Sequence, residues 1–136
     1  MKLSASEIEK RLAQYCGTEG YRFTPITKAA DMVYTDGVKE MAELCGAFWL
    51  LELIASYQPR CMKDRSLREI QFWTLTVKDG KGIVTCERDS DDVFLTQEIE
   101  HTNFPLDEMK VWLELGETSF GQGPVEVMVA MLPSER

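Results

Sequence analysis

YTDGVKEMAELCGAFWLLELIASYQP, residues 34–59, is the longest stretch of the chain that carries both a start signal and a stop signal for a helix. Thr35 or Asp36 can cap the first turn, because a short side-chain oxygen there accepts a backbone N–H group that has no partner inside the helix. Pro59 marks the end, because the residue before a proline is pushed out of helical geometry. The sequence therefore predicts one central helix around which the other elements are arranged.

The apolar residues in the first half of this stretch repeat with the period of a helix. Met41, Cys45 and Phe48 fall on one side, and Lys39 and Glu43 fall on the other. Beyond residue 47 the stretch is apolar on nearly all sides. We therefore expect the second half of the helix to be enclosed by the rest of the protein.

Length and composition predict one α+β domain over residues 1–136. The chain is 44% hydrophobic and contains no run of 18 or more apolar residues, so no membrane-spanning helix is expected. The opening residues MKLSASEIEK lack the apolar segment of a signal peptide, which predicts a cytoplasmic protein. The four cysteines form no C-x-x-C pair, and the chain has one histidine, so reduced thiols are favoured over disulfides and a zinc site is not expected.

The net charge of −8 is concentrated in the second half of the chain. Residues 87–126 contain eleven acidic side chains and two basic ones, whereas residues 58–81 carry a basic excess. Such a molecule repels a phosphate backbone over much of its surface and attracts basic partners. Direct binding to nucleic acid is therefore not expected.

The remaining elements follow from capping signals and from a change of period along the chain. A first helix is expected to begin at one of two possible capping boxes, Ser4 to Glu7 or Ser6 to Glu9, and to close at Gly17. After residue 68 the apolar pattern alternates with a period of 2, as in strands. Strands are predicted over residues 69–78, 81–88, 93–100, 109–115 and 125–132, with an edge strand or ordered loop over 21–26; residues 27–33 are ambiguous, and a short helix remains an alternative for 109–115.

The dipeptide Asp79-Gly80 predicts a tight hairpin, because both central residues of a type I′ turn need a positive φ. The hairpin pairs Lys78 with Lys81 and makes one of its faces uniformly apolar. Its register sets Leu75 opposite Val84 and Trp73 opposite Cys86.

The predicted architecture is α+β, with two N-terminal helices packed on one face of a four- to five-stranded antiparallel sheet. Phe72, Phe94 and Trp112 fall on the strand faces opposite the apparent core. Either the sheet is covered on both sides, or these aromatic residues form an exposed patch for a partner or for a second copy of the chain. A homodimer through this face is therefore one expectation.

Four segments together resemble an uncharacterised family of small bacterial proteins, a domain of unknown function found in bacterial genomes, phages and other mobile elements. They are the stretch 34–59, RSLREIQFWTLTV at 65–77, TCERD at 85–89 and LPSE at 132–135. In similar sequences the strand that contains Trp112 runs almost directly into LPSE, whereas here a loop over 116–123 and a further strand intervene. The resemblance implies no activity and no catalytic residue.

Two features invite a chemical interpretation. Glu52 projects into the stripe of Met41, Cys45 and Phe48, where apolar surroundings would raise its pKa and suit it to acid–base work. The favoured interpretation is that the wet face drifts along the helix, so that Glu52 points to solvent or pairs with an arginine. Cys61 lies among basic residues that would lower its pKa, but its one available imidazole partner, His101, is not brought near it by anything local.

The sequence contains none of the standard nucleotide, hydrolase, zinc-protease or calcium-loop motifs, and no catalytic, cofactor-binding or metal-ligating residue is assigned. The favoured function is a small acidic, non-enzymatic protein that blocks or modulates a basic protein or nucleoprotein complex, such as an anti-defence inhibitor carried by a phage or mobile element. The alternative is a small-ligand-binding domain or enzyme with a pocket near Glu52. The residues predicted to bind the partner are Glu87, Asp89, Asp91, Asp92, Glu98 and Glu100.

Overall fold

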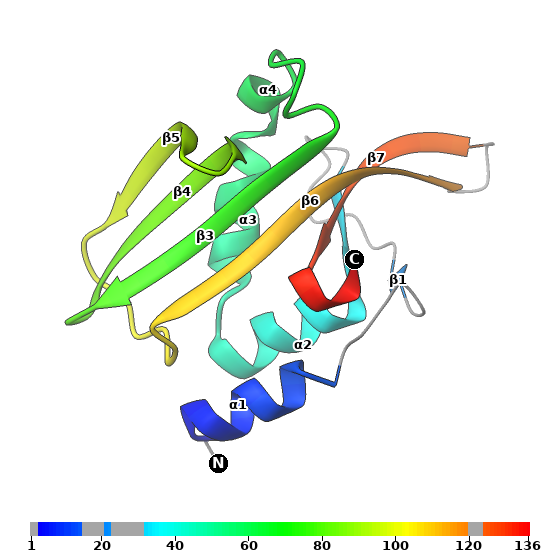
Figure 1. The fold of residues 1–136 in the computed structure, drawn as a ribbon. Helices are drawn as coiled ribbons and strands as arrows, with labels where there is room; N and C mark the ends of the chain where they lie inside the picture. Colours follow the sequence, from blue (N-terminus) through cyan, green and yellow to red (C-terminus); the bar gives the residue numbers. More distant parts are fainter. Residues whose placement is uncertain (1–2, 15–20, 23–31, 120–123) are drawn as a thin grey trace.

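The computed structural model, which describes residues 3–14, 21–22, 32–119 and 124–136, is organised around one mixed sheet (Figure 1). The strands lie in the order β1-β2-β7-β6-β3-β4-β5, and α2 and α3 cover one face of the sheet. The helices are α1 (Ala5–Leu12), α2 (Asp36–Cys45), α3 (Phe48–Ser56), α4 (Gln58–Cys61) and the 3-10 helix η1 (Pro133–Glu135). The strands are β1 (Tyr21–Arg22), β2 (Met32–Thr35), β3 (Ile70–Lys78), β4 (Lys81–Asp89), β5 (Asp92–Ile99), β6 (Glu108–Ser119) and β7 (Pro124–Met131).

The α+β class is confirmed, but the predicted strand count was too low. Among the described residues, six strands have four or more residues, rather than the four to five expected, and β1 adds a seventh of two residues. β2 pairs in parallel with β7, so the sheet is not purely antiparallel. The prediction missed β2 because it passes into α2 at Thr35 with no intervening turn to mark the boundary. The predicted stop at Gly17 and residues 23–26 of the predicted edge strand lie outside the described residues.

The predicted central helix is divided into three helices, which corrects the sequence interpretation. Gly46 ends α2 in the left-handed conformation, with φ of 60°, and α3 begins two residues later. Thr35 is the cap of α2, since its Oγ1 accepts the N–H of Val38 at 3.2 Å. Pro59 lies in the first turn of α4 and does not stop a helix, because a proline there loses no helical hydrogen bond.

Replacing Gly46 with alanine is expected to destabilise the protein through backbone strain alone. No atom lies within 4 Å of the position that a Cβ would occupy, so the substitution causes no clash. The left-handed conformation costs a residue with a Cβ roughly 1–2 kcal/mol. Urea unfolding should show a loss of that size for Gly46→Ala and a smaller loss for Gly46→Asn, since asparagine tolerates this conformation better. Equal stability of the alanine variant and the wild type would contradict the assignment.

The Asp79-Gly80 hairpin has the predicted geometry and register. Asp79 and Gly80 have φ values of 53° and 75°, as a type I′ turn requires. Lys78 pairs with Lys81, and the predicted pairs follow along the strands: Leu75 with Val84 and Trp73 with Cys86. The residues that alternate along the sequence of these two strands therefore lie on opposite faces of the sheet.

The main core lies between the helices and the inner face of the sheet. Each buried aliphatic side chain of this kind contributes roughly 1.5–3 kcal/mol relative to an exposed one. The helices supply Ile8, Leu12, Val38, Met41, Leu50, Leu51 and Ile54, and the strands supply Trp73, Leu75, Val84, Leu95, Val111 and Leu113. One side of α3 contributes Leu50, Leu51, Ile54 and Ala55 to this core, whereas Phe48, Glu52 and Ser56 are exposed. The predicted enclosure of the second half of the helical stretch therefore holds for one side only.

A second, smaller apolar cluster lies on the other side of β7. It forms because β7 is central, between β2 and β6, and carries apolar residues on both faces. Its members are Val33, Val127, Val129 and Met131, against which Trp112 packs.

Two buried polar arrangements hold separate segments together. In the first, Gln58 of α4 and Gln71 of β3 exchange amide hydrogen bonds of 3.0 and 2.9 Å, and Trp73 donates its indole N–H to Gln71 at 2.8 Å. Both glutamines are at least 96% buried, and each also donates to a backbone carbonyl, Gln58 to Ile54 and Gln71 to Leu67. These bonds satisfy polar groups that water does not reach.

In the second arrangement, the buried carboxylate of Glu135 attaches the C-terminus to the start of α2. Its Oε1 accepts the hydroxyl of Thr35 at 2.6 Å and the N–H of Leu132 at 2.9 Å. Its Oε2 accepts the N–H of Gly37 at 3.3 Å. A negative charge at this position also interacts favourably with the helix dipole.

The N-terminal helix α1 begins as the sequence predicted. Ser4 accepts the N–H of Glu7, and the Glu7 carboxylate reaches back to the N–H of Ser4, which completes the capping box.

Within the described part of the chain, no helix combines the length and the apolar character needed to cross a membrane.

Candidate functional site

The six acidic residues predicted to bind a partner lie at the two ends of the hairpin formed by β4 and β5. A strand rises roughly 3.3 Å per residue, so Asp92 at one end of β5 and Glu98 near the other are about 20 Å apart. The structure therefore brings four of the six together and separates the other two. The turn group is Glu87, Asp89, Asp91 and Asp92, and the far group is Glu98 and Glu100.

The turn group is ordered by its own backbone hydrogen bonds. Asp91 adopts a positive φ of 62°, which closes the two-residue turn between Asp89 and Asp92. Glu87 accepts the N–H of Asp91 at 3.2 Å, and Asp89 accepts the N–H of Ser90 at 2.8 Å. The carboxylates are thus held in a fixed arrangement while three of the four residues stay exposed.

Arg88 neutralises part of this charge. It forms ion pairs with Asp64 at 2.8 Å and with Asp92 at 3.0 Å, and its guanidinium lies 4.8 Å from the centre of the Phe94 ring. The hydrogen bond from Arg88 holds the pKa of the Asp64 carboxyl below its usual range. Asp92 is therefore less available to a partner than Asp89 or Asp91. Arg88 belongs to no sequence motif, although it directly precedes the acidic turn.

An aromatic pair lies beside Glu87 on the face of the sheet opposite the helices. Pairing of the strands sets Glu87, Phe72 and Trp112 in one row across β4, β3 and β6. The rings of Phe72 and Trp112 meet edge to face, with centres 5.2 Å apart. Arg136 already places its guanidinium 5.9 Å from the centre of the Trp112 ring, while pairing with Glu114 at 3.3 Å.

Carboxylates and aromatic rings together line a surface hollow of about 300 Å³ on this open face. We call it the acidic hollow. A guanidinium or ammonium group that enters it meets the carboxylates of Glu87 and Asp89 and the edges or faces of two rings. The ammonium of Lys110 also belongs to the lining, and it pairs with Glu108 at 3.9 Å. The residues that line it are Phe72, Thr74, Glu87, Asp89, Ser90, Lys110 and Trp112.

The three aromatic residues that the sequence placed away from the core do not share one face. Phe72 and Trp112 lie on the open face, as predicted. Phe94 was predicted wrongly, because it packs against the main core and against Arg88 and Arg60. The cause is a bulge: Cys86 pairs with Leu95 and Glu87 pairs with Val93, so Phe94 is an extra residue that turns toward the helices.

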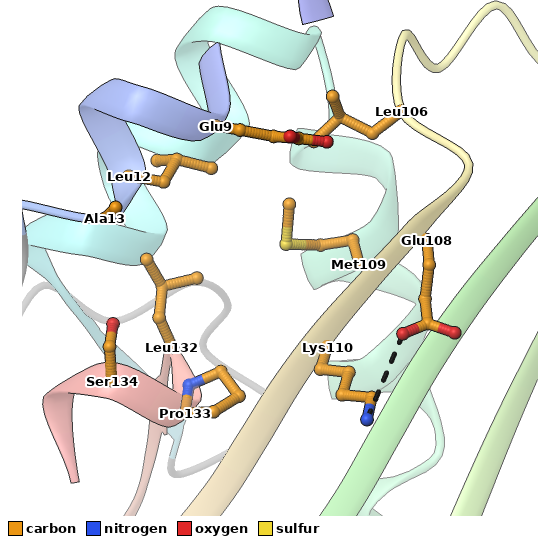
Figure 2. A pocket seen from close by; sticks show the side chains of 10 residues that line it. All are labelled: Glu9, Leu12, Ala13, Leu106, Glu108, Met109, Lys110, Leu132, Pro133 and Ser134. Carbon is orange, nitrogen blue, oxygen red and sulfur yellow. Dashed lines mark ion pairs between the residues drawn. The ribbon is translucent and has the colours of Figure 1, made fainter. Parts of the chain in front are cut away.

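A second hollow, of about 290 Å³, lies between α1, the start of β6 and η1 (Figure 2). Figure 2 shows the side chains of Leu12, Met109 and Leu132 around its apolar interior, with Glu108 and Lys110 paired at 3.9 Å along one side. We call it the apolar pocket. Its lining is completed by Glu9, Ala13, Leu106, Pro133 and Ser134.

Glu52 is exposed on α3 and does not enter the core. The expected position among Met41, Cys45 and Phe48 assumed one continuous helix, whereas Gly46 re-orients α3 relative to α2. Phe48 shows the same change, since it is 42% exposed. The structure thus supports the interpretation in which Glu52 points to solvent.

Cys61 and His101 lie at opposite ends of the β4–β5 hairpin and do not form a pair. Cys61 is fully buried and contacts Cys86 near the turn group. His101 is exposed, and the N–H of the next residue, Thr102, donates to Gly80 in the other turn at 2.8 Å. Across residues 3–14, 21–22, 32–119 and 124–136, no three His, Cys, Asp or Glu side chains come close enough to hold a metal ion.

Comparison with known proteins places the chain by its sequence. Searches among curated proteins and among solved structures found no match. A family model matches residues 6–136, which is nearly the whole chain. The chain belongs to this family, which is described as a family of unknown function, DUF6876.

Proposed function

We propose that this protein is a non-enzymatic binding protein that acts on a basic protein or nucleoprotein complex by holding a cationic side chain in the acidic hollow. The proposal depends chiefly on one observation, the row of Glu87, Phe72 and Trp112 on the open face of the sheet. Carboxylates supply the attraction for a positive charge, and the aromatic rings supply cation–π contacts worth about 0.5–1 kcal/mol at exposed sites.

The contact of Arg136 with Trp112 supports the proposal from within the chain. It places a guanidinium 5.9 Å from the ring centre and beside the carboxylate of Glu114. A partner arginine that approaches Phe72 and Glu87 would meet the same combination of groups on the next strand. Arginine is favoured over lysine as the guest, because its planar group both stacks on rings and pairs with carboxylates.

The wider function that we propose is to block or modulate the partner, with the acidic surface occupying a basic groove. The net charge of −8 supports attraction to such a groove over distances of about 10 Å at ordinary ionic strength. Action as an anti-defence inhibitor encoded by a phage or mobile element, and a cytoplasmic location, belong to this proposal.

The test is a binding titration with a labelled oligoarginine peptide, followed by fluorescence anisotropy. The double variant Glu87→Lys/Asp89→Lys should bind roughly tenfold or more weakly, because it reverses the charge at the hollow. The matched control, Glu98→Lys/Glu100→Lys, makes the same change in net charge about 20 Å away along β5 and should weaken binding by roughly threefold or less.

Further measurements separate a specific site from general attraction. Trp112→Leu removes the ring and keeps the charge, so it should also weaken oligoarginine binding, whereas an oligoglutamate peptide should not bind the wild type. If both charge-reversal variants lose affinity equally and Trp112→Leu has no effect, attraction depends on net charge alone and the acidic hollow is not a site.

A homodimer through the same open face is the remaining proposal for a partner. Ile83 and Val93 lie on it with 47% and 49% of their surface exposed. Such a dimer would cover the hollow and compete with the peptide. Sedimentation velocity at micromolar concentration should then detect a dimer, which oligoarginine should dissociate. If the protein is a monomer throughout this concentration range, the dimer is excluded, and the proposal that the hollow binds a peptide still stands.

A second candidate function is binding of a small ligand in the apolar pocket, favoured by its interior of Leu12, Met109 and Leu132. Pockets for small ligands are concave and mostly apolar, with a few polar groups at defined positions. Native mass spectrometry of the purified protein should then detect a bound molecule that the filling variant Ala13→Trp excludes. An empty wild type that binds oligoarginine favours the first function.

A further inference from the structure

Two cysteines from distant parts of the sequence meet where α4 packs on the sheet. Cys61 is the last residue of α4, and Cys86 lies on β4 and faces the helices. Both are free thiols with 0% exposure, and each is the other's neighbouring thiol. The fold therefore brings the two thiols together.

The surroundings hold α4 and β4 together beside the thiols. Asp64, three residues after Cys61, pairs with Arg88, two residues after Cys86, at 2.8 Å. Arg60 and Arg88 both approach the ring of Phe94, at 5.9 and 4.8 Å. These contacts link the same two segments as the thiols do, so several side chains besides the thiols hold α4 against β4.

We propose that Cys61 and Cys86 are a modification site, a dithiol that an oxidant of the peroxide class converts into an intramolecular disulfide linking α4 to β4. The inference does not depend on the proposed function. Nothing about the partner or the acidic hollow enters it.

The reaction proceeds in two balanced steps. The Cys61 thiolate attacks one oxygen of hydrogen peroxide, the O–O bond breaks, and hydroxide leaves with the thiol's proton as water, which yields a sulfenic acid. The sulfur of Cys86 then attacks the sulfenic sulfur, the S–O bond breaks, and hydroxide leaves with the Cys86 proton as a second water. Two thiols are oxidised by two electrons to one disulfide, and one peroxide is reduced to two waters.

The electrostatics assign the first step to Cys61. The hydrogen bond from Cys86 lowers the pKa of Cys61, with a further contribution from the positive charge of Arg60, although burial opposes it. The same hydrogen bond and burial raise the pKa of Cys86, so this thiol keeps its proton. Burial raises the pKa of Cys45 to about 11, which makes that thiol a poor nucleophile.

Because both thiols are buried, the oxidant must reach them through local opening. α4 has four residues, and the connection that follows it to β3 is polar, so this segment opens at lower cost than the sheet does. Oxidation should therefore be slower than that of an exposed thiol, and a small peroxide should react faster than a bulky disulfide.

The test is to treat the folded wild-type protein with hydrogen peroxide, block the remaining thiols, and map disulfide-linked peptides by mass spectrometry without reduction. The Cys61–Cys86 peptide pair should exceed every other pairing of the four cysteines roughly tenfold or more, because the fold supplies the effective concentration. The same treatment of the urea-unfolded chain should remove this preference. Equal preference in the two states, or free Cys61 and Cys86 beside oxidised Cys45, overturns the proposal.

Three variants check the order of the steps. Cys45→Ser should form the bond as the wild type does. Cys86→Ser should stop after the first step, leaving a Cys61 sulfenic acid that dimedone traps, whereas Cys61→Ser should give little trapped product. A Cys86→Ser variant that is folded by circular dichroism and resists dimedone would contradict the role of Cys61; the wild-type mapping tests the disulfide itself whether or not the variants fold.

Discussion

Glu135→Ala is expected to lower the free energy of unfolding by about 3–5 kcal/mol, because hydrogen bonds to a charged group are worth about 1.5–3 kcal/mol each and their loss leaves buried donors unpaired. Three donors depend on this carboxylate: the hydroxyl of Thr35 and the N–H groups of Gly37 and Leu132. The residue is 4% exposed, so water does not readily replace it. Equilibrium unfolding in urea, followed by tryptophan fluorescence, measures the loss.

Two comparisons make this prediction specific. Glu52→Ala removes an exposed carboxylate and should change stability by about 0.5 kcal/mol or less. A Cβ on Gly37 would lie 2.5 Å from Oε1 of Glu135, and its three nearest atoms all belong to this side chain. Gly37→Ala should therefore cost less in the Glu135→Ala background than in the wild type. Additive effects of the two substitutions would show that Glu135 does not occupy this position.

The parts of the fold that the sequence predicted correctly are those set by neighbouring residues. The Asp79-Gly80 turn determines which residues of β3 and β4 face each other, so alternation along the strands was enough to define the hairpin. The capping box at Ser4 and the cap at Thr35 are likewise local arrangements. Residues within four positions of one another carry all the information these features need.

The errors arose where a local change rotated everything after it. Gly46 interrupts the helical stretch, so angles counted across it no longer describe a single axis, and of the two positions left open for Glu52 the one among Met41, Cys45 and Phe48 was wrong. Phe94 failed for the same kind of reason, since one extra residue in β5 reverses the face on which a side chain lies. The sequence contains both causes, a glycine at position 46 and an acidic turn before β5. Neither of them alone determines how the residues that follow are rotated.

The candidate site could not be predicted completely, because it depends on pairing between strands that are far apart in the sequence. The sequence identified Phe72 and Glu87 separately, and the hairpin register already makes them neighbours. The acidic hollow also needs Trp112, which reaches Phe72 only because β6 pairs with β3 across the sheet. No local pattern specifies that pairing, just as none connects Glu135 with Thr35, 100 residues earlier.

Gln71→Leu is the other substitution expected to have a large effect, with a loss of about 3–4 kcal/mol, because an unpaired buried polar group costs about 1–3 kcal/mol. Gln71 accepts from Trp73 and from Gln58, and it donates to Gln58 and to the carbonyl of Leu67 at 3.1 Å. Leucine fills a similar volume but offers none of these bonds. The indole N–H, the Gln58 amide and the Leu67 carbonyl would all lose a partner at a site with 0% exposure.

The double variant Gln58→Leu/Gln71→Leu distinguishes lost hydrogen bonds from lost packing. Removing both amides eliminates the groups that either single substitution leaves unpaired, so the double variant should be more stable than the sum of the two single losses predicts, by about 1–2 kcal/mol. Gln14→Leu, at an exposed position after α1, controls for the change of residue type. If the two losses add, each glutamine acts independently, and the exchange of amide bonds between α4 and β3 does not stabilise the fold. A double variant that is more stable than the sum of the single losses predicts would instead show that the two amides are tolerated in the core because each provides hydrogen-bond partners for the other.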